Sequence, residues 1–109
     1  MGSMREVQKY IQEKLGTDVK DIQFLRNMVL AATVELTEVM AESPWKPWKP
    51  ENYKKVNKQR VIDELADVQI FILNIMLHHD IYSNEVQDAI VEKQAENIRR
   101  FKNDGVWDA

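Results

Sequence analysis

Cysteine is absent from the 109-residue chain, and glycine and proline occur only three times each. Without cysteine there is no disulfide, thiolate metal site or cysteine nucleophile. The scarcity of turn residues argues against a β-sandwich or barrel with many turns. No apolar run approaches the roughly 20 residues that cross a bilayer, and no signal peptide opens the chain. We therefore expect a cytoplasmic protein that has no membrane partner.

The length suits one domain, with 44% hydrophobic and 30% charged residues, as in globular proteins. A net charge of −3 and a pI of about 5.4 lack the basic character of nucleic-acid-binding proteins, so we expect no nucleic-acid partner. The first three residues precede a second methionine, and we expect them to be a cloning remnant before a single helical domain over 4–109. A deep pocket is hard to build at this size, which favours a groove or a subunit interface as the site.

Apolar residues recur at three- and four-residue steps over most of the chain, which predicts an all-α fold. We expect helices over about 5–15, 18–42, 59–79 and 84–102. Gly16 supplies a stop for the first helix, and Thr17 or Asp18 is the expected N-cap of the second. Ser83 is the expected N-cap of the fourth. Four helices with mostly short connections predict a four-helix, up-down bundle.

A loop of about 15 residues interrupts this pattern after the second helix, because three prolines cannot lie inside a helix. Loops of this length in compact domains are commonly functional. Trp45 and Trp48 could stack on a nucleobase, with Lys46 and Lys49 beside them. Alternatively, the two tryptophans only pin the loop to the bundle. The sequence leaves both interpretations open.

Acidic residues gather on the second and third helices. Glu35, Glu38 and Glu42 fall within about 60° of one another on a helical projection. Glu64 and Asp67 lie three residues apart on a helix that is apolar nearly all round, and such a helix belongs inside a bundle. Buried carboxylates need partners, and a divalent cation can neutralise several of them together. Ligation by oxygen alone favours Mg²⁺ or Mn²⁺ over zinc.

Other interpretations of these acids stay open. Acidic pairs on helices are commonly solvated faces. A di-iron bundle would need Glu-x-x-His on two helices, and no histidine lies three residues after Glu35, Glu38 or Glu64. His78 and His79 fall at the end of the third helix, where we expect them to satisfy terminal carbonyl groups.

The fourth helix carries Lys93, Asn97 and Arg100 on one face, at steps of four and three. These side chains can bind phosphate oxygens. On spacing alone, a solvated cationic helix end is the favoured interpretation.

The acidic pairs resemble a known family signature. Glu35-Leu-Thr-Glu38, a 25-residue gap and Glu64-Leu-Ala-Asp67 look like the ExxE–gap–ExxD motif of the all-α nucleoside triphosphate pyrophosphohydrolases. That group includes MazG proteins, dCTP pyrophosphatases and dimeric dUTPases. Glu42 and the tryptophan–lysine loop are similar to the segment that follows the first acidic pair in the last two. Lys93, Asn97 and Arg100-Phe101 resemble the Lys-x3-Asn-x2-Arg stretch of the last helix.

This resemblance implies a MazG-type helical fold and hydrolysis of the α–β phosphate bond, giving a nucleoside monophosphate and pyrophosphate. It implies Mg²⁺, with Mn²⁺ as a substitute, bound by Glu35, Glu38, Glu64 and Asp67. Glu38 is the first candidate for activating water, and Glu35 is the second. The substrate-binding residues that it implies are Lys93, Asn97, Arg100, Trp45, Lys46, Trp48, Lys49 and Phe71.

It also implies a homodimer or homotetramer whose site borrows residues from a neighbouring subunit, and a role in nucleotide-pool sanitation or supply. The choice among dUTP, dCTP, dATP and dGTP stays open, as does the acceptance of diphosphates. The alternative function is a non-catalytic helical oligomerisation or interaction module whose acidic stripe is only a solvated face. A titration with Mg²⁺ separates the two, because only the enzyme needs a stabilising metal.

Overall fold

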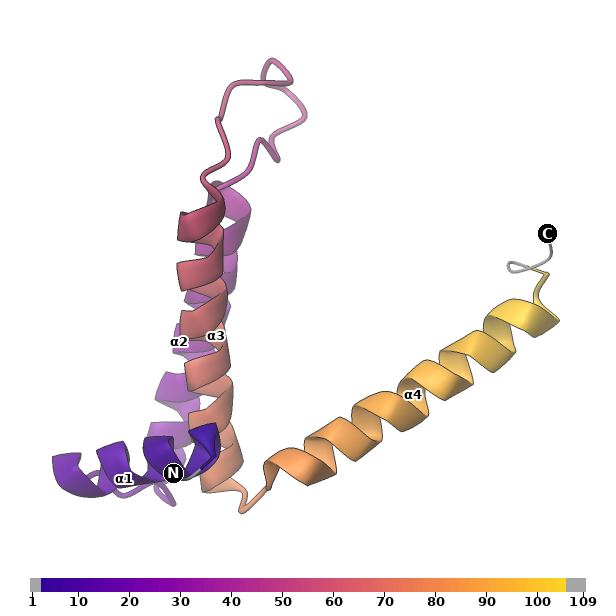
Figure 1. Cartoon of the computed structure of the whole chain (residues 1–109). Coiled ribbons are helices and arrows are strands. Elements are labelled where there is room, and N and C mark those ends of the chain that lie inside the picture. Colours follow the sequence, from indigo (N-terminus) through magenta and orange to yellow (C-terminus); the bar gives the residue numbers. More distant parts are fainter. Residues whose placement is uncertain (1–2, 106–109) are drawn as a thin grey trace.

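The computed structural model describes residues 3–105, and within this range it contains four α-helices and no strand. The prediction of an all-α, four-helix fold is confirmed. In chain order the helices are α1 (Met4–Leu15), α2 (Ile22–Ala41), α3 (Lys58–His78) and α4 (Ser83–Asn103) (Figure 1). None of them is long and apolar enough to cross a membrane, as judged over the described residues.

Local capping signals set the ends of the helices. Gly16 ends α1 in the left-handed conformation at φ +71°, as predicted from its position. The predicted start of the second helix at residue 18 is wrong. The side chain of Asp18 binds the amide of Lys20 and forms a turn, and the side chain of Asp21 caps α2 by accepting from the amide of Gln23 at 2.9 Å. Ser3, set aside above as part of a cloning remnant, caps α1 by accepting from the amide of Glu6.

The hairpin of α2 and α3 is the centre of the fold. The two helices run antiparallel and are joined by the long loop, while α1 packs across α3 at the opposite end (Figure 1). The apolar core is small and comprises Phe24, Ala32, Val68, Met76 and Leu77. At the same junction Asn74 is 3% exposed and accepts from the side chain of Gln12 at 3.3 Å. This bond ties α1 to α3.

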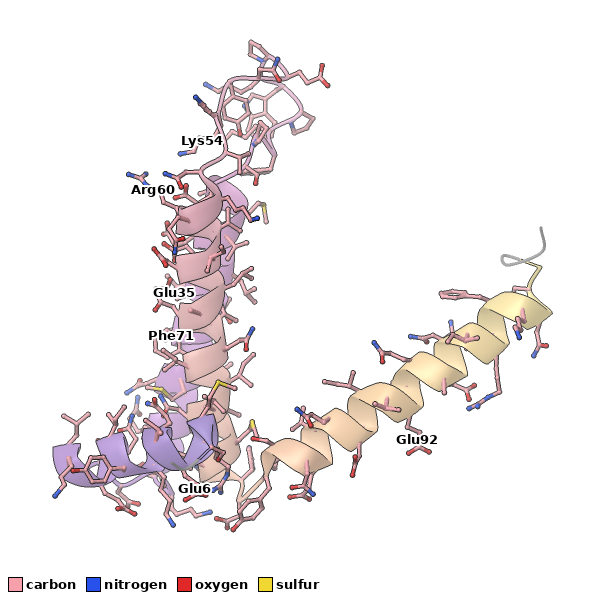
Figure 2. The ribbon with its side chains drawn as sticks, in the orientation of Figure 1. Glu6, Glu35, Lys54, Arg60, Phe71 and Glu92 are labelled. Carbon is pink, nitrogen blue, oxygen red and sulfur yellow. The ribbon has the colours of Figure 1, made fainter. Side chains whose placement is uncertain are left out.

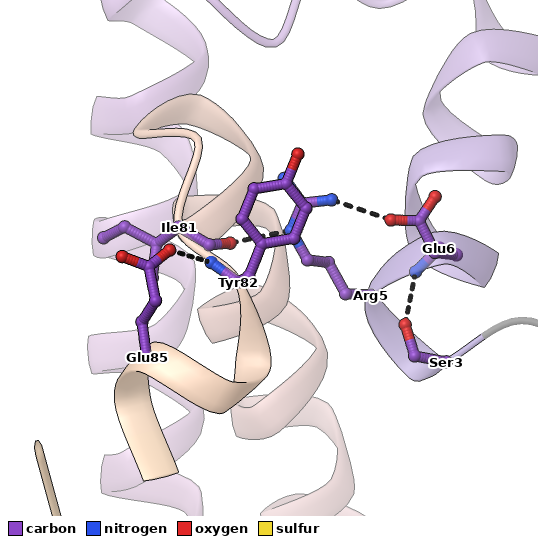
Figure 3. A network of polar contacts seen from close by, with 6 residues as sticks. All are labelled: Ser3, Arg5, Glu6, Ile81, Tyr82 and Glu85. Carbon is purple, nitrogen blue, oxygen red and sulfur yellow. Dashed lines mark hydrogen bonds and ion pairs between the residues drawn. The ribbon is translucent and has the colours of Figure 1, made fainter. Parts of the chain in front are cut away.

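A second set of polar contacts holds the turn between α3 and α4, where Asp80 has φ +55° (Figure 3). Arg5 on α1 is 4% exposed, and its Nε donates to the carbonyl oxygen of Ile81 at 2.7 Å. Its guanidinium carbon lies 4.1 Å from the ring centroid of Tyr82. The amide of Tyr82 donates to the carboxylate of Glu85, so the N-cap of α4 is Tyr82, one residue before the predicted Ser83.

The connection between α1 and α2 holds the same turn from the other side. The Nδ1–H of His78 donates to the carbonyl oxygen of Val19 at 2.7 Å, and Lys20 donates to the carbonyl oxygen of His78 at 2.8 Å. The expectation that the histidine binds carbonyls of its own helix end is therefore wrong, because the carbonyl belongs to a different segment. Lys20 also pairs with Asp80. These contacts fix the direction in which α4 leaves the hairpin.

Helix α4 extends away from the other three helices and has no buried residue among those described (Figure 1). The radius of gyration is 18.2 Å, whereas a compact chain of this length has about 13 Å. Within one chain, the bundle therefore consists of α1, α2 and α3, and α4 stands apart from it.

Candidate functional site

Three carboxylates from α2 and α3 meet on the hairpin. Glu35, Glu64 and Asp67 each offer an oxygen, and these oxygens all lie within 4.8 Å of one another. Glu35 and Glu64 are half-buried, and Asp67 is exposed. Glu64 and Asp67 project from the same face of α3 because three residues make almost one helical turn. We call Glu35, Glu64 and Asp67 the acid group; Figure 2 labels Glu35 on the edge of the hairpin.

Crowding of like charges perturbs the acid group. The pKa of Glu64 is raised from its ordinary 4.5 to about 7. The largest cause is a hydrogen bond with Glu35, which favours the protonated form, followed by partial burial. The negative charges of Glu35, Asp67 and Glu42 raise the pKa further. Without a cation, the acid group therefore holds a proton near neutral pH.

The acid group fits a divalent cation of the Mg²⁺ type. It supplies oxygen ligands only, from two helices that are packed against each other, and oxygen is the ligand that Mg²⁺ and Mn²⁺ prefer. The proton that Glu64 retains marks the excess of negative charge that a cation would neutralise.

The other two acids of the stripe, Glu38 on α2 and Glu42 just after its end, lie outside this group of three. Glu38 is exposed and does not contribute an oxygen to it. Glu42 is half-buried at the end of α2, and its Oε2 is buried without a hydrogen-bond partner among the described residues. The acidic stripe seen in the sequence therefore divides in space into Glu35, which meets Glu64 and Asp67, and a part that continues toward the loop.

The tryptophan loop presents its rings at the surface. Trp45 is 45% exposed and Trp48 is 68% exposed, with their ring centroids 5.6 Å apart in an edge-to-face arrangement. The Nζ of Lys46 lies 5.9 Å from the ring of Trp45, and Lys49 is exposed. Sequence reasoning missed Tyr53, whose hydroxyl accepts from the amide of Lys46 at 3.1 Å. That bond closes the loop and holds the tryptophan segment in place.

Phe71 lies one helical turn beyond Asp67 on the same face of α3 and is half-buried. Figure 2 shows it on the same edge of the hairpin as Glu35. An aromatic ring is thus available beside the carboxylates.

The predicted phosphate-binding residues of α4 are exposed and lie on the helix that leaves the hairpin. Lys93, Asn97 and Arg100 share one face by their spacing, together with Val86 and Ile90. Within one chain, the structure does not bring this face to the acid group (Figure 1).

Comparison with known proteins gives one family. A protein-family model described as dUTPase matches residues 1–104. No curated protein and no solved structure matches the chain. The family match covers α1 to α4, including both acidic helices and the loop between them.

Proposed function

The chain belongs to this dUTPase family, whose members are hydrolases acting on nucleoside triphosphates. We therefore propose that it uses Mg²⁺ to cleave the α–β phosphate bond of a deoxynucleoside triphosphate, and that dUTP is the preferred substrate. The products would be a nucleoside monophosphate and pyrophosphate, in keeping with a role in nucleotide-pool sanitation or supply. The observation that carries the proposal is the convergence of Glu35, Glu64 and Asp67 within 4.8 Å.

In the proposed mechanism the acid group would hold Mg²⁺, which would neutralise the phosphates and polarise the reacting phosphoryl group. Glu38 is exposed one turn from Glu35, so its carboxylate is available to orient or deprotonate the attacking water. Trp45, Trp48 and Phe71 offer rings to the base or ribose, with Lys46 and Lys49 next to the tryptophans. Lys93, Asn97 and Arg100 contact the phosphates and the sugar.

The last assignment requires a second subunit, and the surface of the chain supports one. The chain exposes 8602 Å², whereas a compact protein of its mass exposes about 6,300 Å². The excess, about 2,300 Å² per chain, is of the size that obligate homodimers bury. Large apolar side chains on α2, α3 and α4 are left at the surface, among them Leu30 at 64% and Ile90 at 49%. We therefore include a homodimer or homotetramer in the proposal, with α4 serving the acid group of its neighbour.

Product analysis tests the reaction. With dUTP and Mg²⁺, pyrophosphate should be the first product, and Asp67→Asn should abolish its release while leaving the helical content intact. Asp63→Asn is the matched control, because Asp63 is an exposed carboxylate on the same helix that accepts a hydrogen bond from the side chain of Gln59. Initial release of orthophosphate, or equal activity of Asp67→Asn and the control, would contradict the proposal.

A mixing experiment tests the shared site. Asp67→Asn and Arg100→Ala should each be inactive alone. When the two are refolded together as a dimer, about a quarter of the wild-type activity should return, because half of the dimers are mixed and each mixed dimer has one intact site. If α4 serves its own chain, no mixed dimer has an intact site, and the mixture stays inactive.

A further inference from the structure

A basic cavity opens where the loop after α2 joins α3, and its volume is about 560 Å³. Its charged lining residues are four cations and one acid, namely Lys54, Lys55, Lys58, Arg60 and Glu42. The whole chain carries a net charge of −3, so this concentration of positive charge is local. A cavity of this charge attracts an anion.

The four cations have no hydrogen-bond or ion-pair partner in the part of the chain that the structure describes. Across residues 3–105, none of their side chains takes part in an ion pair or a hydrogen bond, whereas Arg5, Lys20 and Arg99 do form ion pairs. Cations gathered around one cavity repel each other. Because no carboxylate among the described residues pairs with them, their charge is available to a ligand.

The backbone of the cavity is fixed by the start of α3. The side chain of Asn57 accepts from the amides of Gln59 and Arg60 at 3.1 and 3.3 Å. These bonds occupy donors that would otherwise face an anion, so the side chains must supply the contacts. The positive end of the helix dipole adds to their effect.

The cavity adjoins the acid group along α3. Arg60, Glu64 and Asp67 follow the spacing of one helix face, and the rise per residue places Arg60 about 6 Å along the axis from Glu64. Figure 2 shows Lys54 and Arg60 at the loop end of the hairpin, on the same edge as Glu35. Glu42 lines the cavity and also acts electrostatically on Glu64. The two sites are therefore neighbours that share Glu42 as a border.

We infer that this cavity binds the terminal phosphates of the nucleotide whose α-phosphate lies at the acid group, and then the pyrophosphate product. The inference rests on the proposed function. Lysine and arginine side chains are the usual ligands of phosphate oxygens, and the arginine fork can bind two of them at once. The tryptophans do not line the cavity, so contact with the base remains a separate matter.

The test measures binding of inorganic pyrophosphate by calorimetry in EDTA, so that no metal can bring the anion to the carboxylates. Wild type and Asp67→Asn should both bind it. Lys54→Gln/Arg60→Gln should bind about tenfold more weakly or worse, because two charge-assisted contacts are lost. Lys9→Gln/Lys14→Gln is the control with the same change in charge, since both lysines are exposed on α1. The KM for dUTP should rise in the cavity variant, while inhibition by dUMP, which lacks the terminal phosphates, should stay unchanged.

The outcomes separate this inference from the proposed function. If wild type hydrolyses dUTP and the cavity variant matches it in pyrophosphate binding and in KM, the inference is overturned and the function stands. If wild type hydrolyses no triphosphate but binds pyrophosphate through Lys54 and Arg60, the function fails and the anion site is upheld. Equal losses in the cavity variant and in the α1 control would show a general charge effect and would overturn the inference.

Discussion

Removal of the Arg5 side chain should weaken both the fold and the direction of α4. The guanidinium donates to the carbonyl oxygen of Ile81 at 2.7 Å and lies 4.1 Å from the centroid of the Tyr82 ring. A hydrogen bond from a charged donor contributes about 1.5–3 kcal/mol, and the cation–π contact contributes about 1 kcal/mol. The ion pair with Glu6 is partly exposed and adds little. Arg5→Met, which keeps an apolar stem, should therefore reduce the free energy of unfolding by about 2–4 kcal/mol.

Urea denaturation at a fixed protein concentration measures this loss, since the stability of an oligomer depends on concentration. Lys9→Met is the matched control, because Lys9 is a cation on the same helix and is exposed. Arg5→Lys should recover only part of the stability, since an ammonium group lacks the planar fork that reaches the carbonyl while covering the ring.

The same variant has a functional consequence. Arg5 contacts the turn before α4 (Figure 3). Its neighbour Glu6 lies at the α1 end of the hairpin, whereas Glu35 lies farther along it toward the loop (Figure 2). We expect Mg²⁺ affinity to be retained and kcat/KM for dUTP to fall. If the free energy of unfolding of Arg5→Met lies within about 0.5 kcal/mol of the wild-type value, these contacts do not hold the turn.

Three further predictions concern the site. In the metal-free protein the pKa of Glu64 is raised to about 7, chiefly by its hydrogen bond with Glu35. The folded state therefore holds a proton more tightly than the unfolded state. Stability should therefore fall as pH rises from 4.5 to 7, and Glu64→Gln should flatten that slope in urea titrations; an unchanged slope would contradict the assignment. Glu38→Gln should lower turnover by about 100-fold or more with Mg²⁺ affinity nearly unchanged, whereas a parallel loss of metal binding would make Glu38 a ligand instead. Trp45→Ala or Trp48→Ala should raise the KM for dUTP by about ten- to a hundredfold, with a smaller effect on kcat; a lower melting temperature with an unchanged KM would show that the rings only anchor the loop.

Much of the local structure follows from the sequence, because helix signals act over a few residues. Three- and four-residue spacing predicts the helices, Gly16 predicts the end of α1, and the three prolines predict the loop. The start of α2 was missed because Thr17, Asp18 and Asp21 are all good caps. The sequence offers no local reason to prefer Asp21, which caps α2 in the structure.

The candidate site shows the same division. Spacing alone puts Glu64 and Asp67 on one face of α3. Glu35 lies close to them, whereas Glu38 stays exposed. This difference depends on the rotation of α2 relative to α3, which is set by packing between residues about thirty positions apart in the sequence.

Contacts between residues far apart in the sequence cannot be predicted from local patterns. In the sequence, nothing distinguishes Arg5 from an exposed cation. In the structure, α1 packs against the turn before α4, and the Arg5 side chain is buried there. Only the tertiary structure shows that the loop returns to Glu42 and places Lys54 and Arg60 around one open cavity. Which helices form, and which side chains share a helix face, can be predicted from the sequence because helical hydrogen bonding is local. Which helix faces meet cannot be predicted in this way, because contacts between helices depend on the packing of the whole chain.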